Sequence, residues 1–375
     1  MKIAIFSYTM DRKAMGTALY TRELIKNILD LKNQDDEIFL IHRERNDDPL
    51  YKQVNEIFLP KINLPRFSYF LSEAIFLWKT RKDFEVIHYP QESIYPLFWL
   101  SKAKIVLTVH SAMEGWQKFS YLRRRWWLVY WTLKLFHKRI SSIIAISNST
   151  KKSIQRFFAV PDDKIHVIYQ GVDQSFFKEI KKEEARKLMN SKYGLPVPYI
   201  LNGSRIDPHK NVQRLIRAYA ILKKRHNGTV PKLIIGAKHW PAENRAVENL
   251  INDLNLKTEI FSTPYIASED MPQLYAGAEM FVFPSLHEGF GLPIIESMAA
   301  GTPVITSNVF SMPEISGNAA MLVDPYDVQS IASAMEKILN DPSCVSDLVS
   351  RGSLLARTFD WRKTAEETIL VYSSL

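Results

Sequence analysis

Cysteine is almost absent from this chain of 375 residues, which has Cys344 alone and therefore cannot form an internal disulfide. Such a composition is typical of proteins that fold in a reducing cytoplasm. Long apolar runs are absent as well, because no uninterrupted segment reaches the roughly 20 residues that a membrane-spanning helix needs. The run Met1–Ser7 is shorter than the apolar core of a signal peptide, and we expect it to form a strand. These absences argue against an integral membrane protein and predict a cytoplasmic one.

The sequence also lacks tandem repeats of roughly 20 to 50 residues and low-complexity tracts. It contains neither the ligand spacing of a zinc site nor an RNA-binding motif, so nucleic acid is not an expected partner. Hydrophobic residues make up 46% and charged residues 24% of the chain, which is the balance of a folded globular protein. A length of 375 residues suits two domains of ordinary size.

Acidic residues are scarce in one part of the first half of the chain. Residues 1–180 contain 28 Lys and Arg against 19 Asp and Glu, whereas residues 181–375 contain 21 of each, so the whole excess of +9 lies in the first half. Within 102–156 there are 12 basic residues and one acid, Glu114, which gives this segment a charge of +11. A block of like charge of this size predicts an anionic partner.

Short apolar runs alternate with helical patterns along the whole chain. Such alternation predicts an α/β fold with parallel sheets covered by helices on both faces, in which ligands bind beyond the carboxyl ends of the strands. The expected strands are residues 2–7, 38–41, 54–59, 86–89, 105–109, 143–147, 164–168, 199–203, 232–236, 260–265, 278–284 and 304–306. The expected helices include residues 67–80, 121–138, 268–276, 294–300 and 327–339, and a last helix that contains Trp361.

The most informative stretch runs from His287 to Asn308. The apolar run before it ends in proline, as expected of a buried strand that stops at its carboxyl end. Gly289 and Gly291 follow, and Pro293 stands at the first position of the expected helix. Glycines let a ligand approach the backbone closely, and the free N–H groups at the start of a helix favour an anion. The stretch therefore predicts an anion site between a strand and a helix.

Two carboxylates, Glu288 and Glu296, flank this anion site with seven residues between them. A carboxylate does not bind phosphate, so each is expected to accept hydrogen bonds from hydroxyl groups, as a ribose or a hexose offers. The alternative is that one Glu simply faces solvent and the other simply favours the helix dipole. The glycines, prolines and strand ends around the pair specify the same pocket independently, which favours the ligand-binding interpretation.

The stretch HEGFGLPIIES closely resembles the Glu-x7-Glu signature of the family-four retaining glycosyltransferases. The resemblance extends over nearly the whole chain, and it implies the GT-B architecture, in which two Rossmann-like parallel-sheet domains face a central crevice. We expect an acceptor-side domain at 1–175, a nucleotide-sugar-binding domain at 176–359, and a carboxyl-terminal helix at 360–375 that crosses back onto the first domain. The charged stretch between Asp173 and Pro198 is expected to contain the boundary.

The resemblance also implies roles for residues of the second domain. Arg205 and Lys210 match the basic residues that grip the donor's pyrophosphate, Arg205 as a fork and Lys210 as a compact charge. Glu296 is assigned to the donor ribose and Glu288 to the transferred sugar, whose cationic face it also stabilises; Glu288, Arg205 and Lys210 are taken as catalytic. The other residues expected to contact the donor are Gly289, Phe290, Gly291 and Leu292 around the helix start, and Tyr265 and Ile266 beside the base.

In the first domain the resemblance points to two residues. His110 follows the expected strand 105–109 at the position of the family's histidine that faces the donor sugar, and it is taken as catalytic. Family members commonly have Asp after this histidine, whereas this chain has Ser111, and a histidine after a buried strand can also be purely structural. Gly16 lies between the first strand and the first helix, where it either contacts the donor or serves a structural turn.

The implied reaction moves a hexose from a nucleotide-diphosphate sugar to a glycan or lipid-linked acceptor in polysaccharide or glycolipid assembly, with GDP-mannose as the favoured donor. Many transferases of another fold neutralise the leaving diphosphate with a metal that an Asp-x-Asp motif holds. This chain contains no Asp-x-Asp, so Arg205, Lys210 and the helix start near Gly291 are expected to replace the metal. No metal or other cofactor is therefore expected.

Alternatives to this reaction stay open at the level of sequence. The donor can be a UDP-sugar or an ADP-sugar, and the acceptor can be soluble. Retention implies front-side attack in which the leaving phosphate helps to deprotonate the acceptor, but a covalent sugar intermediate is also compatible with the sequence. An isomerase of the same fold, which acts on a nucleotide sugar without an acceptor, is the alternative from another class.

The basic segment 102–156 contains Trp116, Trp126, Trp127 and Trp131, which are half of the eight tryptophans of the chain. Tryptophans flanked by Lys and Arg are favoured at a membrane boundary, where each basic residue adds about 1 kcal/mol on an anionic leaflet. We therefore expect the first domain to dock peripherally on an anionic membrane and to reach a lipid-linked acceptor. The alternative is a buried helix, which accounts for Trp126 and Trp127 but not for the charge of +11.

Overall fold

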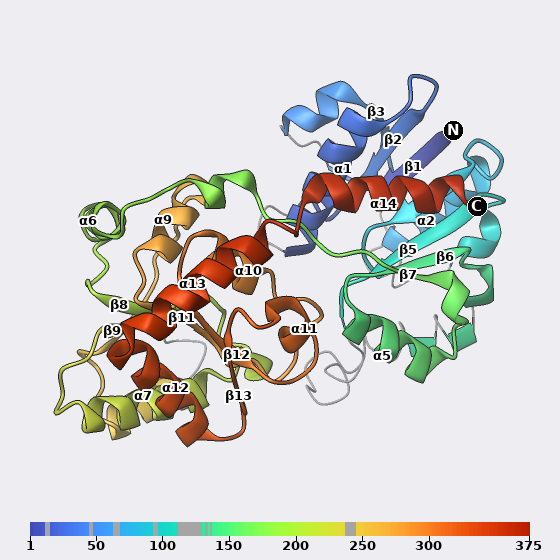
Figure 1. Cartoon of the computed structure of the whole chain (residues 1–375). Coiled ribbons are helices and arrows are strands. Elements are labelled where there is room, and N and C mark those ends of the chain that lie inside the picture. Colours follow the sequence, from blue (N-terminus) through green and yellow to red (C-terminus); the bar gives the residue numbers. More distant parts are fainter. Residues whose placement is uncertain are drawn as a thin grey trace. The chain divides into compact units, whose positions relative to one another are not determined.

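The structure is a computed structural model of the chain (Figure 1). It describes residues 1–11, 16–44, 48–62, 68–92, 97–111, 130–131, 134–135, 137–236 and 245–375. The chain divides into two compact units, which are Met1–Gly171 together with Trp361–Leu375, and Val172–Asp360.

The first unit is built on a parallel sheet of seven described strands in the order β3-β2-β1-β4-β5-β6-β7. The strands are β1 (Lys2–Phe6), β2 (Glu37–His42), β3 (Asn55–Phe58), β4 (Val86–Tyr89), β5 (Lys104–Val109), β6 (Ser142–Ala145) and β7 (Ile165–Val167). The order reverses between β1 and β4, and in open α/β sheets ligands bind beyond the carboxyl ends of strands at such a point.

Helices cover both faces of this sheet, and β1 shows why. Ile3 and Ile5 point to the core beneath α1 and α14, two helices that also contact each other, whereas Ala4 and Phe6 point to the opposite core beneath α2 and α5. Successive side chains of a strand face opposite sides, so a strand that is apolar throughout has to be covered twice. The helical elements are α1 (Gly16–Leu31), η1 (Pro49–Gln53), α2 (Ser68–Lys79), η2 (Phe98–Leu100), η4 (His137–Arg139), α5 (Asn148–Phe158), η5 (Asp162–Lys164) and α14 (Trp361–Ser373).

The second unit contains a parallel sheet of six described strands in the order β10-β9-β8-β11-β12-β13. The strands are β8 (Tyr199–Asn202), β9 (Lys232–Ile235), β10 (Ile260–Ser262), β11 (Met280–Phe283), β12 (Val304–Ser307) and β13 (Met321–Val323). Its order reverses between β8 and β11. Two parallel sheets with covering helices confirm the α/β fold class expected from the sequence.

Helices cover this second sheet as well, and α7 and α12 pack side by side on it. Leu215 and Ile216 of α7 and Ile331 and Met335 of α12 are completely buried in the same core as Ile200 of β8. The helical elements are η6 (Gln174–Phe177), α6 (Lys182–Tyr193), η7 (Pro208–Lys210), α7 (Val212–Arg225), α8 (Arg245–Asp253), η8 (Ser268–Asp270), α9 (Met271–Ala276), α10 (Leu292–Ala299), α11 (Met312–Ser316), α12 (Val328–Asn340) and α13 (Pro342–Ala356).

The charged stretch in which the sequence analysis places the domain boundary folds as part of the second unit. Its central part is helix α6, whose Ala185 and Met189 are buried four residues apart on one face. The helix ends at Gly194, which has a φ of +66° and caps it in the left-handed conformation. The high charge of this stretch therefore belongs to the solvent face of an amphipathic helix.

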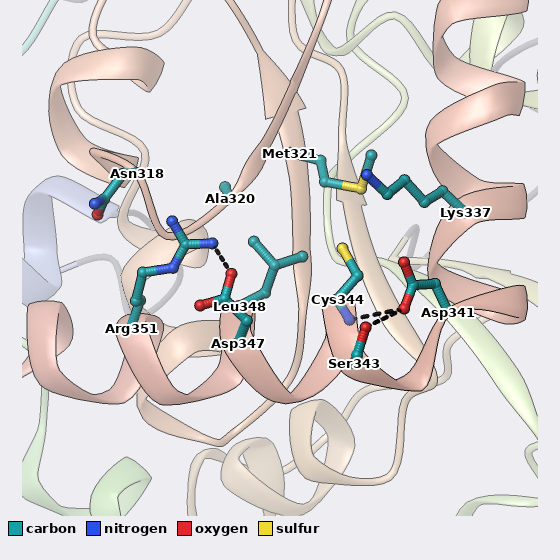
Figure 2. A pocket seen from close by; sticks show the side chains of 10 residues that line it. All are labelled: Asn318, Ala320, Met321, Lys337, Asp341, Ser343, Cys344, Asp347, Leu348 and Arg351. Atoms are coloured by element: carbon teal, nitrogen blue, oxygen red, sulfur yellow. Dashed lines mark hydrogen bonds and ion pairs between the residues drawn. The ribbon is translucent and has the colours of Figure 1, made fainter.

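A polar depression of about 460 Å³ lies among α12, α13 and β13. Figure 2 shows that the Asp341 carboxylate accepts hydrogen bonds from the Ser343 hydroxyl at 2.6 Å and from the Cys344 N–H at 3.0 Å, which caps α13. Arg351 pairs with Asp347 one turn away along the same helix. The acidic side chains of the depression are thus engaged within the protein, and its lining contains none of the residues predicted to bind a ligand.

No helix in the described part of the chain is both long and apolar enough to cross a membrane. Within the basic segment 102–156, residues 112–129, 132–133 and 136 lie outside the described residues. The helix expected at 121–138 therefore lies mostly outside the described residues. Trp116, Trp126 and Trp127 lie entirely outside them.

Candidate functional site

The loop between β11 and α10 depends on a glycine. Gly291 immediately precedes α10 and has a φ of +109°, in the left-handed region that residues with a Cβ rarely adopt. A Cβ at this position would also lie 2.9 Å from Cδ1 of Ile294. Pro293 stands in the first turn of α10, where its missing N–H costs no helical hydrogen bond. The loop places the free N–H groups of the α10 N-terminus just beyond the carboxyl end of β11.

Ser311, which the sequence analysis did not single out, fixes this loop. Its hydroxyl is completely buried and donates to the carbonyl oxygens of Glu288 and Phe290, at 3.0 and 2.8 Å. The Phe290 ring is buried edge-on against Phe359, with 5.9 Å between the ring centroids. Phe290 can therefore offer a ligand only its backbone, and Leu292 beside it is half-buried.

The loop between β8 and α7 is tied to the β11–α10 loop. Asn211 has a φ of +60°, and its buried side-chain amide donates to the carbonyl oxygens of Pro284 at 3.0 Å and Pro325 at 2.7 Å. The N–H of Leu286 donates to the carbonyl oxygen of His209 at 2.7 Å. The motif around Asn211 is visible in the sequence, but its role as a clamp between three strand ends is not, because its partners are 73 and 114 residues away.

These contacts bring Lys210 against Glu288. The Lys210 ammonium lies 2.6 Å from a carboxylate oxygen of Glu288, and the two side chains are only 18% and 13% exposed. The same ammonium lies 5.0 Å from the ring centroid of Phe283, at the end of β11. Two residues that the sequence analysis assigns to different parts of the donor thus form one ion pair in the described structure.

The ion pair determines the charge of Glu288. Burial acts to raise the pKa of the Glu288 carboxyl, but Lys210, His209 and the Ser285 hydroxyl together hold this pKa below its ordinary value. Glu288 is therefore ionised at neutral pH, and burial keeps the pKa of His209 lowered, so that this imidazole is neutral there. The Lys210 ammonium and the Glu288 carboxylate, both largely shielded from solvent, therefore lie at the start of α10.

Glu296, on the first turns of α10, has a different environment. Burial and, to a smaller extent, the nearby Asp173 raise the pKa of its carboxyl to about 7, and the hydrogen bond from the Tyr275 hydroxyl keeps this pKa from rising further. That hydrogen bond joins the Tyr275 oxygen to Oε2 of Glu296 at 3.0 Å. Tyr275 was not identified from the sequence, where it reads as one more apolar position of a short helix.

Arg205 follows β8 and is open to solvent. Its side chain is 78% exposed, and its guanidinium lies 2.9 Å from a carboxylate oxygen of Asp207. Among the described residues this is the only ion pair of Arg205, and a surface ion pair contributes little to stability and is easily exchanged for another anion. In the part of the chain that the structure describes, no three His, Cys, Asp or Glu side chains are placed to share a metal ion.

Tyr265 and Ile266 follow β10, which is the edge strand of the described sheet. The Tyr265 side chain is 69% exposed, and Ile266 is half-buried. Two strands, β9 and β8, separate β10 from β11, so these residues lie at one side of the sheet and the Lys210–Glu288 pair lies near its middle. Their assignment to the donor base stays a prediction.

His110 of the first unit follows β5, and its imidazole is fixed by its surroundings. Its Nε2 lies 2.6 Å from the carbonyl oxygen of Pro90, and the Tyr20 ring meets it edge-on with 4.6 Å between the centroids. Burial lowers the pKa of His110 against the opposing effects of Glu92 and Pro90, so the ring is neutral at pH 7. Because the Nε2–H group donates to the Pro90 carbonyl oxygen, Nδ1 of the neutral ring is left as a hydrogen-bond acceptor.

The carboxylate of Glu92 lies beside the backbone of His110 and Ser111. Its Oε1 accepts the backbone N–H of His110 at 2.7 Å and that of Ser111 at 3.1 Å. Glu92 cannot be linked to His110 from the sequence, because it belongs to the loop after β4, 18 residues before His110. The orientation of this turn is thus set from a neighbouring strand.

Gly16 is the first residue of α1 and is exposed. No described atom lies within 4 Å of the position that a Cβ would occupy there, and its φ is not in the left-handed region. Neither crowding nor backbone conformation among the described residues requires a glycine, and contact with a donor stays a prediction.

Several solved structures match this chain over both of its parallel-sheet units, and one of them is WaaG, a glycosyltransferase involved in lipopolysaccharide biosynthesis. Sucrose-phosphate synthase from Thermosynechococcus elongatus matches with a TM-score of 0.81 at 23% identity, over 100% of this chain and 98% of that one. HepE from Anabaena, solved in complex with UDP-glucose, matches with a TM-score of 0.77 at 19% identity, over 100% of both chains. The fold is therefore the GT-B fold, as expected from the sequence.

Two family models match within this fold. The model for "Glycosyltransferase Family 4" matches residues 16–176, and the model for "Glycosyl transferases group 1" matches residues 185–353. The chain belongs to the family-four glycosyltransferases.

Curated relatives include several mannosyltransferases. O-antigen chain mannosyltransferase B of Escherichia coli is 32% identical over 64% of this chain and 64% of its own length, and the MMP α-(1→4)-mannosyltransferase of Mycolicibacterium hassiacum is 27% identical over 99% of this chain and 98% of its own. The serotype-specific mannosyltransferase WbdA of Escherichia coli is 31% identical over 64% of this chain. The match spans only 29% of WbdA, so this chain corresponds to less than a third of that relative.

Proposed function

We propose that the protein is a retaining glycosyltransferase that transfers a hexose from a nucleotide-diphosphate sugar to a glycan or lipid-linked acceptor. The observation that carries this proposal is the Lys210–Glu288 pair, 2.6 Å apart, in the loops that meet at the N-terminus of α10. A cation and free helical N–H groups favour a diphosphate, whereas the carboxylates of Glu288 and Glu296 favour hydroxyl groups. A nucleotide-diphosphate sugar carries both kinds of group in one molecule.

Catalysis has to stabilise the negative charge that develops on the diphosphate as its bond to the anomeric carbon breaks. Lys210 is suited to this role because its ammonium is shielded from water, where electrostatic attraction is stronger than at the surface. Arg205 is suited because its planar guanidinium can leave Asp207 and bind two phosphate oxygens. We assign the leaving diphosphate to Lys210, Arg205 and the N–H groups that follow Gly291.

For retention we propose front-side attack. The acceptor oxygen bonds to the anomeric carbon on the face from which the diphosphate departs, the bonding electron pair leaves with the diphosphate, and the acceptor proton passes to a phosphate oxygen. Glu288 is ionised, and we assign it to stabilising the positive charge that the sugar ring develops. Because the Glu288 carboxylate is paired with the Lys210 ammonium, we favour this electrostatic role over attack by Glu288 on the sugar.

Among donors we favour GDP-mannose, because several curated relatives are named as mannosyltransferases. Two of these are named for O antigen or serotype, which favours an acceptor in polysaccharide assembly. UDP-sugars are the alternative, because the HepE structure contains UDP-glucose. ADP-sugars and a soluble acceptor remain further alternatives.

The test is to incubate the protein with GDP-mannose, UDP-glucose and ADP-glucose in turn, with and without glycan and lipid-linked acceptors. We expect one donor to release its nucleoside diphosphate in an acceptor-dependent way. The anomeric configuration of the product, followed by NMR, should equal that of the donor. An inverted product would contradict retention, and conversion of the donor to another nucleotide sugar without an acceptor would favour the isomerase.

Activity is expected to need no added divalent metal, because Arg205 and Lys210 are assigned the charge that an Asp-x-Asp-bound metal neutralises elsewhere. The measurement is the initial rate of nucleoside diphosphate release in excess EDTA, compared with the rate in magnesium or manganese. A rate that EDTA abolishes and either metal restores would contradict this prediction.

We further propose that the first unit docks on an anionic membrane through the basic segment 102–156. Described residues beside this segment have the same character. The side chains of Trp78 on α2 and Trp99 on η2 are 62% and 49% exposed, and these two elements contact each other. Large exposed aromatic side chains next to basic residues favour a headgroup boundary.

The basic residues lie close to these tryptophans. The N–H of Lys102 donates to the carbonyl oxygen of Arg81 at 2.9 Å, three residues after Trp78. The Arg139 guanidinium donates to the carbonyl oxygen of Ser101 at 3.2 Å, two residues after Trp99. These contacts support an amphipathic docking surface that does not depend on the burial of Trp126 and Trp127.

Docking is tested by cosedimentation with liposomes that contain an anionic lipid. A variant with Arg123, Arg124 and Arg125 all replaced by Ser is expected to sediment several-fold less at low salt, since each basic residue contributes about 1 kcal/mol. The matched control removes three exposed cations of the second unit, by replacing Lys181, Lys187 and Lys257 with Ser, and is expected to sediment like the wild type. Equal sedimentation of all three proteins, with no preference for anionic over neutral liposomes, would leave the buried-helix interpretation standing.

A further inference from the structure

Tyr275 is buried behind the carboxylate that we assign to the donor ribose. It lies on α9, is 2% exposed, and donates its hydroxyl proton to Oε2 of Glu296 on α10 at 3.0 Å. Among the described residues, no hydrogen bond reaches Oε1, the other oxygen of this carboxylate. The two oxygens of Glu296 are therefore distinguished by the protein itself.

The Tyr275 ring is held so that its hydroxyl has one position. It meets Phe281 edge-on with 5.4 Å between the centroids, and Phe176 of η6 packs against it at 5.8 Å. Its backbone carbonyl accepts the Thr302 hydroxyl at 2.7 Å. A Cβ built on Gly203, at the end of β8, would lie 3.5 Å from the Tyr275 hydroxyl oxygen. These contacts limit the positions that the Tyr275 hydroxyl can take.

We propose that Tyr275 is a positioning residue for Glu296, because its hydroxyl holds Oε2 and thereby presents Oε1 to the diol of the donor ribose. This inference rests on the proposed function and adds to it a residue that does not touch the substrate. A carboxylate that is held through one oxygen loses less rotational freedom when the other oxygen binds a ligand. Removal of the Tyr275 hydroxyl should therefore weaken donor binding without removing a donor contact.

The same arrangement makes donor binding depend on pH. The groups that act on the charge of Glu296 are Tyr275 from α9 and Asp173 from the start of η6, an element that packs on α10. Only the ionised carboxylate accepts two hydrogen bonds from a diol, so affinity is expected to rise as the pH increases through about 7. Loss of the Tyr275 hydroxyl raises the pKa of Glu296, and loss of the Asp173 charge lowers it.

The variants Tyr275→Phe and Asp173→Asn should thus move the midpoint of this pH dependence in opposite directions. Tyr275→Phe removes one oxygen atom and keeps the ring. Asp173→Asn keeps an oxygen in place of Oδ1, which accepts the Ser175 N–H at 2.7 Å, and so keeps the cap of η6. A role in folding alone would not shift the two midpoints in opposite directions.

The experiment is isothermal titration calorimetry of the full chain with GDP, UDP and ADP between about pH 5.5 and 8.5. For the nucleotide that binds, Tyr275→Phe is expected to raise Kd about three- to tenfold at neutral pH. It should have less effect on the 2′-deoxy form of that nucleotide, which lacks one hydroxyl of the diol. The matched control is Tyr219→Phe, because Tyr219 is also fully buried in the second unit and donates its hydroxyl to the Pro231 carbonyl at 3.0 Å.

The possible outcomes separate this inference from the proposed function. If Tyr275→Phe binds the nucleotide with the same Kd and the same pH midpoint as the wild type, the role of Tyr275 is overturned and the proposed function stays intact. Equal losses in Tyr275→Phe and Tyr219→Phe would also overturn it, since they would indicate a general effect on stability. A wild-type protein that binds none of the three nucleoside diphosphates would overturn the proposed function, and this inference with it.

Discussion

Replacing Lys210 by Ala is expected to lower kcat more than tenfold. The reason is that the charge of the leaving diphosphate is greatest in the transition state, so that losing one charge-assisted contact costs about 1.5–3 kcal/mol at that point. Arg205→Ala is expected to lower kcat in the same way. The measurement is the steady-state rate of nucleoside diphosphate release under saturating donor. Unchanged kcat in both variants would remove Lys210 and Arg205 from the catalytic machinery.

The two variants differ in what they do to the fold. Arg205 is 78% exposed, so its removal should leave the free energy of unfolding almost unchanged. Lys210→Ala leaves the shielded Glu288 carboxylate without its partner at 2.6 Å, so it should also lower stability. The matched control is Lys223→Ala, which breaks an ion pair with Glu259 at 3.0 Å elsewhere in the second unit. A stability loss with full activity is expected for this control.

Replacing each of the two glutamates of the Glu-x7-Glu stretch is expected to change a different kinetic parameter. Glu288→Gln keeps the shape of the side chain and removes its charge, so it should lower kcat about tenfold while donor KM changes little. Glu296→Ala should chiefly raise donor KM, because a ribose contact is equally strong in the ground state and the transition state. Steady-state kinetics with varied donor concentration separates the two effects. A wild-type donor KM in Glu296→Ala would show that this residue does not hold the ribose.

Much of the fold can be predicted from the sequence because its signals are local. The apolar runs of β1 and β11, the glycine at 291 and the proline at 293 each require a particular backbone conformation within a few residues. Helix α6 also had a local signal, in the spacing of Ala185 and Met189, but the charge of its solvent face obscured it. The charged stretch was therefore assigned to the boundary and not to a helix.

The parts of the site that escaped prediction depend on contacts between distant segments. The Lys210–Glu288 pair joins residues 78 positions apart, and the Ser311 hydroxyl reaches back more than 20 positions to the carbonyl of Glu288. Tyr275 and Glu92 act through a hydroxyl and a carboxylate that nothing in their local sequence distinguishes from ordinary core and loop residues. Such roles are defined by the strand order of the two sheets, which brings the loops together.

The measurement that tests the central claim most directly is a thermal-shift panel of GDP, UDP, ADP and TDP on the wild type and on Glu296→Ala. A ligand that binds only the folded state adds about 2.7 kcal/mol of stability at 100 times its Kd, and therefore raises Tm. We predict that at least one of these nucleotides raises the Tm of the wild type and that the shift is much smaller in Glu296→Ala. No shift with any of the four at millimolar concentration, or equal shifts in both proteins, would contradict a nucleotide-sugar site at Glu296.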